Sequence, residues 1–142
     1  MERRTTVPSL KQPTQAGVEK LTINLGYVDL GQIDLLVAEG FYANRSDFIR
    51  TAIRNHLRSH ADALQQVVAR KMLVLGMQHF SQADLLRVQA AGEKLQIRVL
   101  GLASIAQDVP AQLAAETIES ITVLGALQAS PAVRAALAGR IT

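Results

Sequence analysis

Residues 19–25, EKLTINL, alternate between polar and apolar side chains along most of their length. Side chains of a β-strand alternate sides with a period of two, so this run has two distinct faces. The apolar face consists of Leu21, Ile23 and Leu25, and the polar face consists of Lys20, Thr22 and Asn24. The sequence therefore predicts a strand with one hydrophobic face and one hydrogen-bonding face.

This predicted strand has no neighbour nearby in the chain, because no other strand-like run occurs before about residue 70. A lone strand cannot satisfy its own backbone N–H and C=O groups. The nearest partner is the same strand of a second copy, paired antiparallel about a two-fold axis. The polar face then becomes a two-stranded ribbon, which fits the major groove of DNA and carries donors and acceptors suited to base edges.

Two helical patterns follow the strand. Over residues 28–39 the apolar side chains recur at helical spacing, and Gly40 stands at the C-cap position. The next motif, NRSD at 44–47, offers Asn44 as an N-cap with Asp47 three residues later, a capping box with Asp in place of Glu. No Gly or Pro occurs between Leu57 and Gly76, which allows the second helix to continue to residue 71, although its apolar register changes at 59–62.

The segment TINLGYVDLGQIDLLVAEGFYANRSDFIRTAIRNHL, at 22–57, resembles the ribbon-helix-helix family of DNA-binding regulators, the CopG, Arc and MetJ group. The most similar piece is GFYANRSDFIRTAIR, and the resemblance covers about residues 19–60. Gly26-Tyr27-Val28 departs from the Pro or Ser that many members have before an acidic first turn. The resemblance implies that bases are contacted by Lys20, Thr22 and Asn24. It also implies that a backbone phosphate is held at the start of the second helix by Asn44, Arg45 and Ser46.

Residues 1–18 mix Thr, Pro, Gln and Ser with a few cations and show no periodicity, which predicts a flexible basic arm. Arg3 and Arg4 are its candidate DNA contacts, since basic arms of other DNA binders lie along phosphates or in a minor groove. The alternative is a solvated tail without a role.

A second module, residues 62–142, contains an internal repeat. The tripeptide Val-Leu-Gly ends at Gly76, Gly101 and Gly125, and a helical apolar pattern begins about eight or nine residues after each glycine. Pro110 and Pro131 stand near two of the helix starts, where a missing N–H costs nothing. The repeat predicts strands that end in Val-Leu-Gly, pair in parallel and have helices packed behind them, as a short solenoid with leucine-rich-repeat-like geometry.

The outer strands of such a module would expose apolar edges, which natural proteins seldom leave open. One expectation is that another chain closes the edge and produces a tetramer or larger assembly. In the alternative, a helix through Leu64 and Val68 covers one edge and residues 140–142 cover the other, which leaves a plain dimer.

Composition excludes several other classes of protein. The 142 residues include no cysteine, so there is no disulfide scaffold and no thiolate metal site. No catalytic constellation or phosphate-binding loop occurs, and His56 and His60 lack a convincing third metal ligand. We therefore predict a non-enzyme without cofactor or metal. No apolar run is long enough to span a membrane, and the net charge of +3 suits nucleic acid only weakly.

The sequence as a whole predicts a cytoplasmic, prokaryotic, homodimeric, sequence-specific transcriptional regulator. Residues 19–61 bind double-stranded DNA, and residues 62–142 join dimers or receive a signal. One alternative is an antitoxin, whose C-terminal part would bind a toxin protein. Another is a plasmid-partition or architectural DNA binder.

Overall fold

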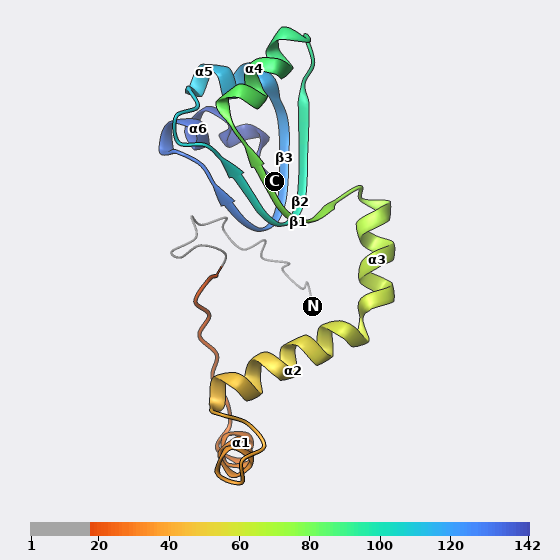
Figure 1. The fold of residues 1–142 in the computed structure, drawn as a ribbon, viewed down its shortest axis with the longest axis vertical. Coiled ribbons are helices and arrows are strands. Elements are labelled where there is room, and N and C mark those ends of the chain that lie inside the picture. The colour runs from red at the N-terminus through yellow and green to blue at the C-terminus, as the bar shows by residue number, and fades with distance from the viewer. Residues whose placement is uncertain (1–17) are drawn as a thin grey trace, which may run out of the picture. The chain divides into compact units, whose positions relative to one another are not determined.

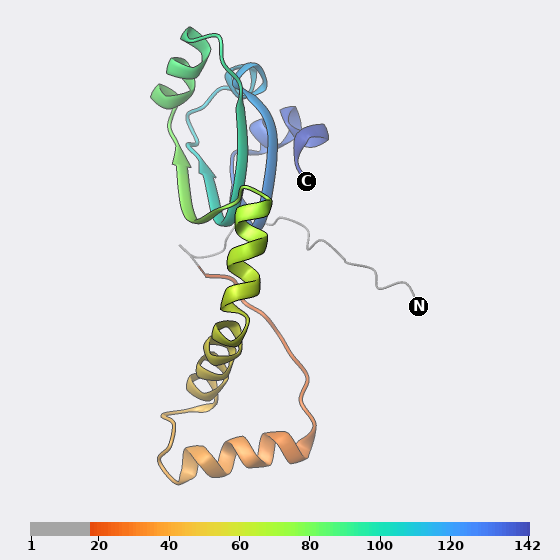
Figure 2. The same cartoon turned by 90° about the vertical axis from the view of Figure 1, so that its right-hand side faces the viewer.

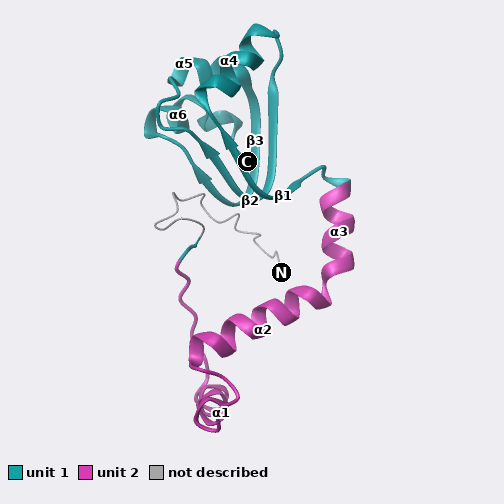
Figure 3. Ribbon diagram, viewed as in Figure 1, with its two compact units in different colours: residues 1–19, 70–142 teal, residues 20–69 magenta. Residues whose placement is uncertain are grey.

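The computed structural model describes residues 18–142, so Arg3 and Arg4 of the predicted arm lie outside the described residues. The chain divides into two compact units, which Figure 3 distinguishes by colour. One unit spans residues 20–69, and the other spans residues 70–142 together with Val18 and Glu19. Each unit is described separately below.

Helix α1 (Tyr27–Ala38) begins and ends within one residue of the predicted 28–39. Its end is a Schellman motif centred on Gly40, which has a φ of +83°. The Gly40 N–H donates to the Val37 carbonyl at 3.1 Å, and the Phe41 N–H donates to the Leu36 carbonyl at 3.0 Å. A left-handed residue is required there, so glycine decides where α1 stops.

The second helix does not continue to residue 71. Helix α2 (Arg45–Ser59) ends at His60, which has φ −104° and ψ 11°, and a separate helix α3 (Ala61–Arg70) begins at the next residue. The two helices are labelled in Figure 1. The break falls where the apolar register changes in the sequence. An uninterrupted helix would place the apolar residues of the two segments on different faces.

Residues 19–25 have no helix or strand assignment in the single chain. Their apolar side chains are exposed, with Leu21 at 80% and Ile23 at 59% of full exposure. A strand is defined by backbone pairing with a neighbour, and the predicted neighbour belongs to a second copy.

The unit 70–142 contains three strands: β1 (Val74–Phe80), β2 (Leu95–Ile105) and β3 (Ile118–Gln128). All pair in parallel in the order β1-β2-β3, which confirms the predicted parallel sheet. The strands alternate with α4 (Gln82–Ala90), α5 (Ala111–Thr117), α6 (Pro131–Ala136) and a final 3₁₀ turn, η1 (Ala138–Arg140). Pro110 caps α5 and Pro131 opens α6, as predicted. The fold is therefore mixed α and β with a parallel sheet.

The strands do not end in Val-Leu-Gly as predicted, because each continues past its glycine. Gly76, Gly101 and Gly125 pair with one another across the sheet, and their φ angles are +126°, +140° and +122°. A Cβ on Gly101 would lie 2.1 Å from the Gly76 carbonyl oxygen. Only glycine adopts this backbone conformation readily, and a row of glycines lets all three strands turn together within the sheet, a turn that Figures 1 and 2 show.

The core of this unit lies between the sheet and its helices. β2 contributes every second residue, such as Ile97 and Val99, because alternate side chains of a strand point to the same face. β3 contributes Ile121 and Val123, and the helices contribute fully buried residues such as Leu85 of α4. The residues between them on β2, such as Gln96 and Arg98, lie on the other face and are exposed to solvent.

The two edges of the sheet differ. Beside β3, the Thr142 N–H donates to the Ile121 carbonyl at 2.8 Å, and the Val123 N–H donates to the Thr142 carbonyl at 3.3 Å. The Arg140 guanidinium holds this ending in place through the carbonyls of Ala115 and Ile118, at 2.6 and 2.8 Å. Closure of this edge by residues 140–142 was one of the two alternatives drawn from the sequence. Beside β1, the described residues include no second neighbouring strand.

Candidate nucleic-acid interface

The predicted base-contacting side chains are all available for contact. Lys20, Thr22 and Asn24 are exposed, and within the described part of the chain no side-chain hydrogen bond engages any of them. They alternate with the apolar residues of the same segment. If this segment forms a strand, the three polar side chains share one face.

The unit 20–69 buries very little of its apolar surface. Ile33 is its single buried residue, at 7% exposure, and α2 has none. On α2, the apolar side chains of Ile53 and Leu57, four residues apart, are 52% and 53% exposed. A segment of this size needs a shared core to be stable, and an exposed apolar face of this extent is characteristic of an interaction surface.

The start of α2 has the geometry of an anion-binding helix end. The Asn44 side-chain oxygen accepts the Asp47 N–H at 2.8 Å, which confirms Asn44 as the N-cap. The first bond within the helix runs from the Phe48 N–H to the Asn44 carbonyl at 3.2 Å. The backbone N–H groups of Arg45 and Ser46 have no partner among the described residues, so two donors remain for a phosphate at the positive end of the helix dipole.

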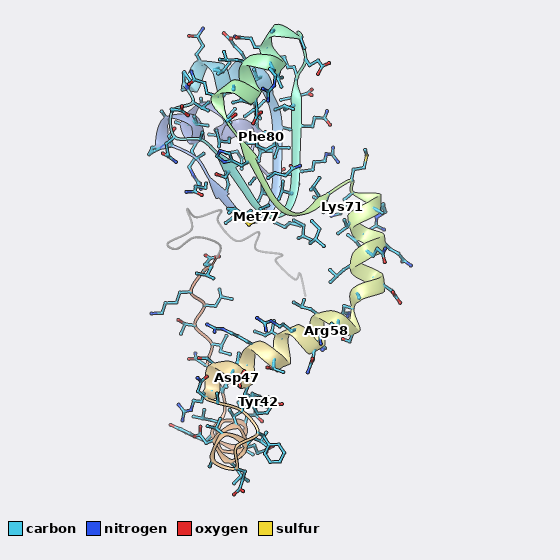
Figure 4. The ribbon with its side chains drawn as sticks, in the orientation of Figure 1. Tyr42, Asp47, Arg58, Lys71, Met77 and Phe80 are labelled. Carbon is cyan, nitrogen blue, oxygen red and sulfur yellow. The ribbon has the colours of Figure 1, made fainter. Side chains whose placement is uncertain are left out.

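Asp47 presents an acidic group close to this helix end, labelled in Figure 4. Its carboxylate oxygen Oδ2 accepts the Ala43 N–H at 2.9 Å, one residue earlier than in a standard capping box. The carboxylate is thereby held back towards the segment that precedes the helix, which leaves the helix end able to accept an anion.

Arg45, a predicted phosphate contact, has an acidic partner that the sequence did not indicate. Its Nε donates to Oδ1 of Asp34 at 2.7 Å, and its Nη2 donates to Oδ2 at 2.8 Å. The bond from Arg45 and its positive charge lower the pKa of the Asp34 carboxyl, and the same pairing raises the pKa of Arg45. The two residues are eleven apart and on different helices, so no periodicity within one helix could reveal the pair.

Two pairs of histidine or aromatic rings in this unit pack edge to face on each other. The rings of His56 and His60 meet edge to face at 4.9 Å, and the described residues contain no group of three or more metal-ligating side chains. Tyr42, in the turn between α1 and α2, packs edge to face on Phe48 with ring centroids 5.0 Å apart. Phe41, by contrast, is 71% exposed.

None of the helices within residues 18–142 combines the length and apolar character that crossing a membrane requires.

Comparisons with curated proteins and with solved structures give no match. The model of the ribbon-helix-helix transcriptional regulator family matches residues 16–134, which include the parallel sheet as well as the segment that carries the sequence resemblance. The chain therefore belongs to the ribbon-helix-helix transcriptional regulator family.

Proposed function

We propose that the chain is a homodimeric, sequence-specific DNA-binding regulator whose dimer forms through residues 19–25. The observation that supports this most is the exposed apolar surface of the unit 20–69, where Ile33 alone is buried. Antiparallel pairing of two copies of 19–25 would satisfy the backbone groups of both strands. It would also cover Leu21, Ile23 and the apolar face of α2 with the partner's helices.

In this dimer the ribbon enters the major groove, and each copy presents Lys20, Thr22 and Asn24 to base edges. Two phosphates, one on each side of the ribbon, bind at the starts of the two α2 helices through the free N–H groups of Arg45 and Ser46. Asn44 contributes by capping the helix. Arg3 and Arg4 of the N-terminal arm add contacts to the backbone or to a minor groove.

We assign the second module, residues 62–142, to association or signal reception. Its repeats form a short solenoid, and contacts between copies of it build an assembly beyond the dimer, such as a tetramer. Such an assembly holds several half-sites at once and gains from effective concentration. The extensive buried core of this unit favours a regulator over an antitoxin, since a C-terminal segment that must wrap a toxin has little reason to fold alone.

Binding of the purified full-length protein to fragments of its own genome tests this function. Sequencing of the retained fragments should reveal a shared inverted repeat close to promoters. Retention of fragments in proportion to their abundance would contradict sequence-specific binding. Enrichment of a cluster of sites at a plasmid partition locus would favour the alternative DNA-binding role.

A further inference from the structure

Strand β1 has an unprotected edge. Its sequence, VLGMQHF, contains no Asp, Glu, Lys, Arg or Pro. Proteins commonly use charges or proline to prevent an edge strand from pairing with another chain. The opposite edge of the same sheet is occupied by the chain's own Thr142, hydrogen bonded to Ile121. The two edges thus differ in a way that leaves β1 as the one open to a partner.

Leu75 and Met77 lie on the face of β1 that points away from the helices, and His79 follows them on the same face. Leu75 is 73% exposed and Met77 is 74% exposed, and Figure 4 labels Met77 on this strand. Val74, which pairs with the buried Val99, lies on the helix-facing side and is still 43% exposed because β1 is the edge strand. An exposed apolar pair beside an unpaired strand edge is typical of a surface that another strand covers.

Gly76 supplies an independent observation. At Gly101 and Gly125 the Cβ position is blocked by the carbonyl oxygen of the preceding strand's glycine, at 2.1 and 2.0 Å. The corresponding position at Gly76 points beyond the free edge of β1, where no atom of the described residues lies within 4 Å. Gly76 nevertheless has the same unusual φ, +126°. β1 therefore turns together with β2 and β3, and the space beside Gly76 at its free edge is open to the backbone of a further strand.

We infer that this further strand is β1 of a second copy, paired antiparallel about a two-fold axis with Gly76 opposite Gly76. Two identical edges that meet by a two-fold axis must run antiparallel. The turn at Gly76 fixes the register, because two bent strands keep their hydrogen bonds only if their turns coincide. Leu75 of each copy then stands directly opposite Met77 of the other.

The chemistry of this pairing is self-complementary. The two most exposed apolar side chains of the strand cover each other, and the strand carries no formal charge that would be repeated across the axis. The inference rests on the proposed association through residues 62–142 and names the surface by which it occurs. It requires nothing of DNA binding by the ribbon.

Cysteine cross-linking of the full-length protein tests the register, since the chain contains no native cysteine. Leu75→Cys and Met77→Cys are made separately, and the two variants are also coexpressed. Directly opposed residues lie about 4.5–5.5 Å apart between Cα atoms, within the range that a disulfide spans. In either single variant the identical cysteines are offset by two residues along the strands, which places them beyond about 7 Å.

We expect covalent dimers on a non-reducing gel from the coexpressed pair after mild oxidation, and little from either variant alone. Equal cross-linking of a single variant, or none from the coexpressed pair, would overturn the inference. Light scattering on the unmodified protein then separates the two levels of failure. A mass above the dimer without cross-linking leaves the proposed association intact but places it on another surface. A dimer mass without cross-linking would contradict both the β1–β1 pairing and the proposed association beyond the dimer. The segment at Val18 and Glu19 would then be the candidate to cover Leu75 and Met77, because these four residues line one hollow.

Discussion

The guanidinium of Arg45 donates two hydrogen bonds to the carboxylate of Asp34, with Nε–Oδ1 and Nη2–Oδ2 distances of 2.7 and 2.8 Å. The pair links the first turn of α2 to α1 and neutralises an arginine at the helix end that we assign to phosphate. Because the pKa of Asp34 is lowered in the fold, the pair contributes stability above the ordinary pKa of aspartate. That contribution is lost as the pH falls through the lowered pKa.

Asp34→Asn should increase DNA affinity, because it frees the charge of Arg45 for the nearby phosphate. The gain should be similar for specific and random DNA. The slope of log K against log salt concentration should steepen by about 0.9 for each additional phosphate contact. Asp62→Asn makes the same change in net charge on α3 and serves as the control in anisotropy titrations. Equal slopes for the two variants would show that Arg45 does not lie near a phosphate.

Ile23→Asp and Thr22→Asp place the same charge on opposite faces of the predicted strand. Aspartate at 23 falls in the shared core of the dimer, where an unpaired charge is strongly unfavourable, so this variant should lose the dimer and the fold of residues 20–69. Aspartate at 22 should preserve the dimer and abolish DNA binding, because its negative charge is repelled by the DNA phosphates and replaces a side chain that contacts bases. Light scattering and circular dichroism distinguish these outcomes. A Thr22→Asp variant that dissociates as readily as Ile23→Asp would be inconsistent with the assigned faces.

Ser46→Glu should weaken binding to every DNA sequence by about the same factor, because a carboxylate at the second residue of α2 occupies the anion site at the helix end. Asn55→Glu adds the same charge to an exposed position later in α2 and should have a much smaller effect. Titrations with operator and random duplexes measure both. Loss of operator binding alone would show that Ser46 contributes to base recognition and not to phosphate binding.

Gly101→Ala should destabilise the unit 70–142, since its Cβ would lie 2.1 Å from the Gly76 carbonyl oxygen on a backbone with φ +140°. Strain of this conformation costs about 1–3 kcal/mol before the collision is counted. Gly139→Ala is the control, because no atom lies within 4 Å of its Cβ and its φ is ordinary. Thermal unfolding should show a clear loss of Tm for the first variant only. Equal Tm values would indicate that the glycine row is not required for the turn.

The sequence predicted the elements whose signals are local. Gly40 and Asn44 mark the end of α1 and the start of α2, because a left-handed residue and a capping side chain act within one turn of the backbone. The spacing of Gly76, Gly101 and Gly125 predicted the parallel strands, since equal repeats stack in register.

Features that depend on distant contacts were missed. The strands continue past their glycines because the three paired glycines turn together. In the sequence of one strand alone, a glycine is interpreted as the end of the strand. The Asp34–Arg45 pair depends on how α1 and α2 pack. The closure of β3 by Thr142 was one of two alternatives, and a choice between them required knowledge of where η1 directs the chain.

Asn24→Ala tests the assignment of base recognition to the ribbon most directly. If Asn24 contacts a base edge in each half-site, its removal should lower the preference for the operator over random DNA by about 1–3 kcal/mol per lost contact. The dimer and its non-specific binding should remain. Asn55→Ala, which removes the same exposed side chain from α2, is the matched control. The measurement is competition of labelled operator against random DNA, at one salt concentration, for the wild type and both variants. We predict a large loss of preference for Asn24→Ala and none for Asn55→Ala; an unchanged operator preference in Asn24→Ala would contradict recognition by the ribbon.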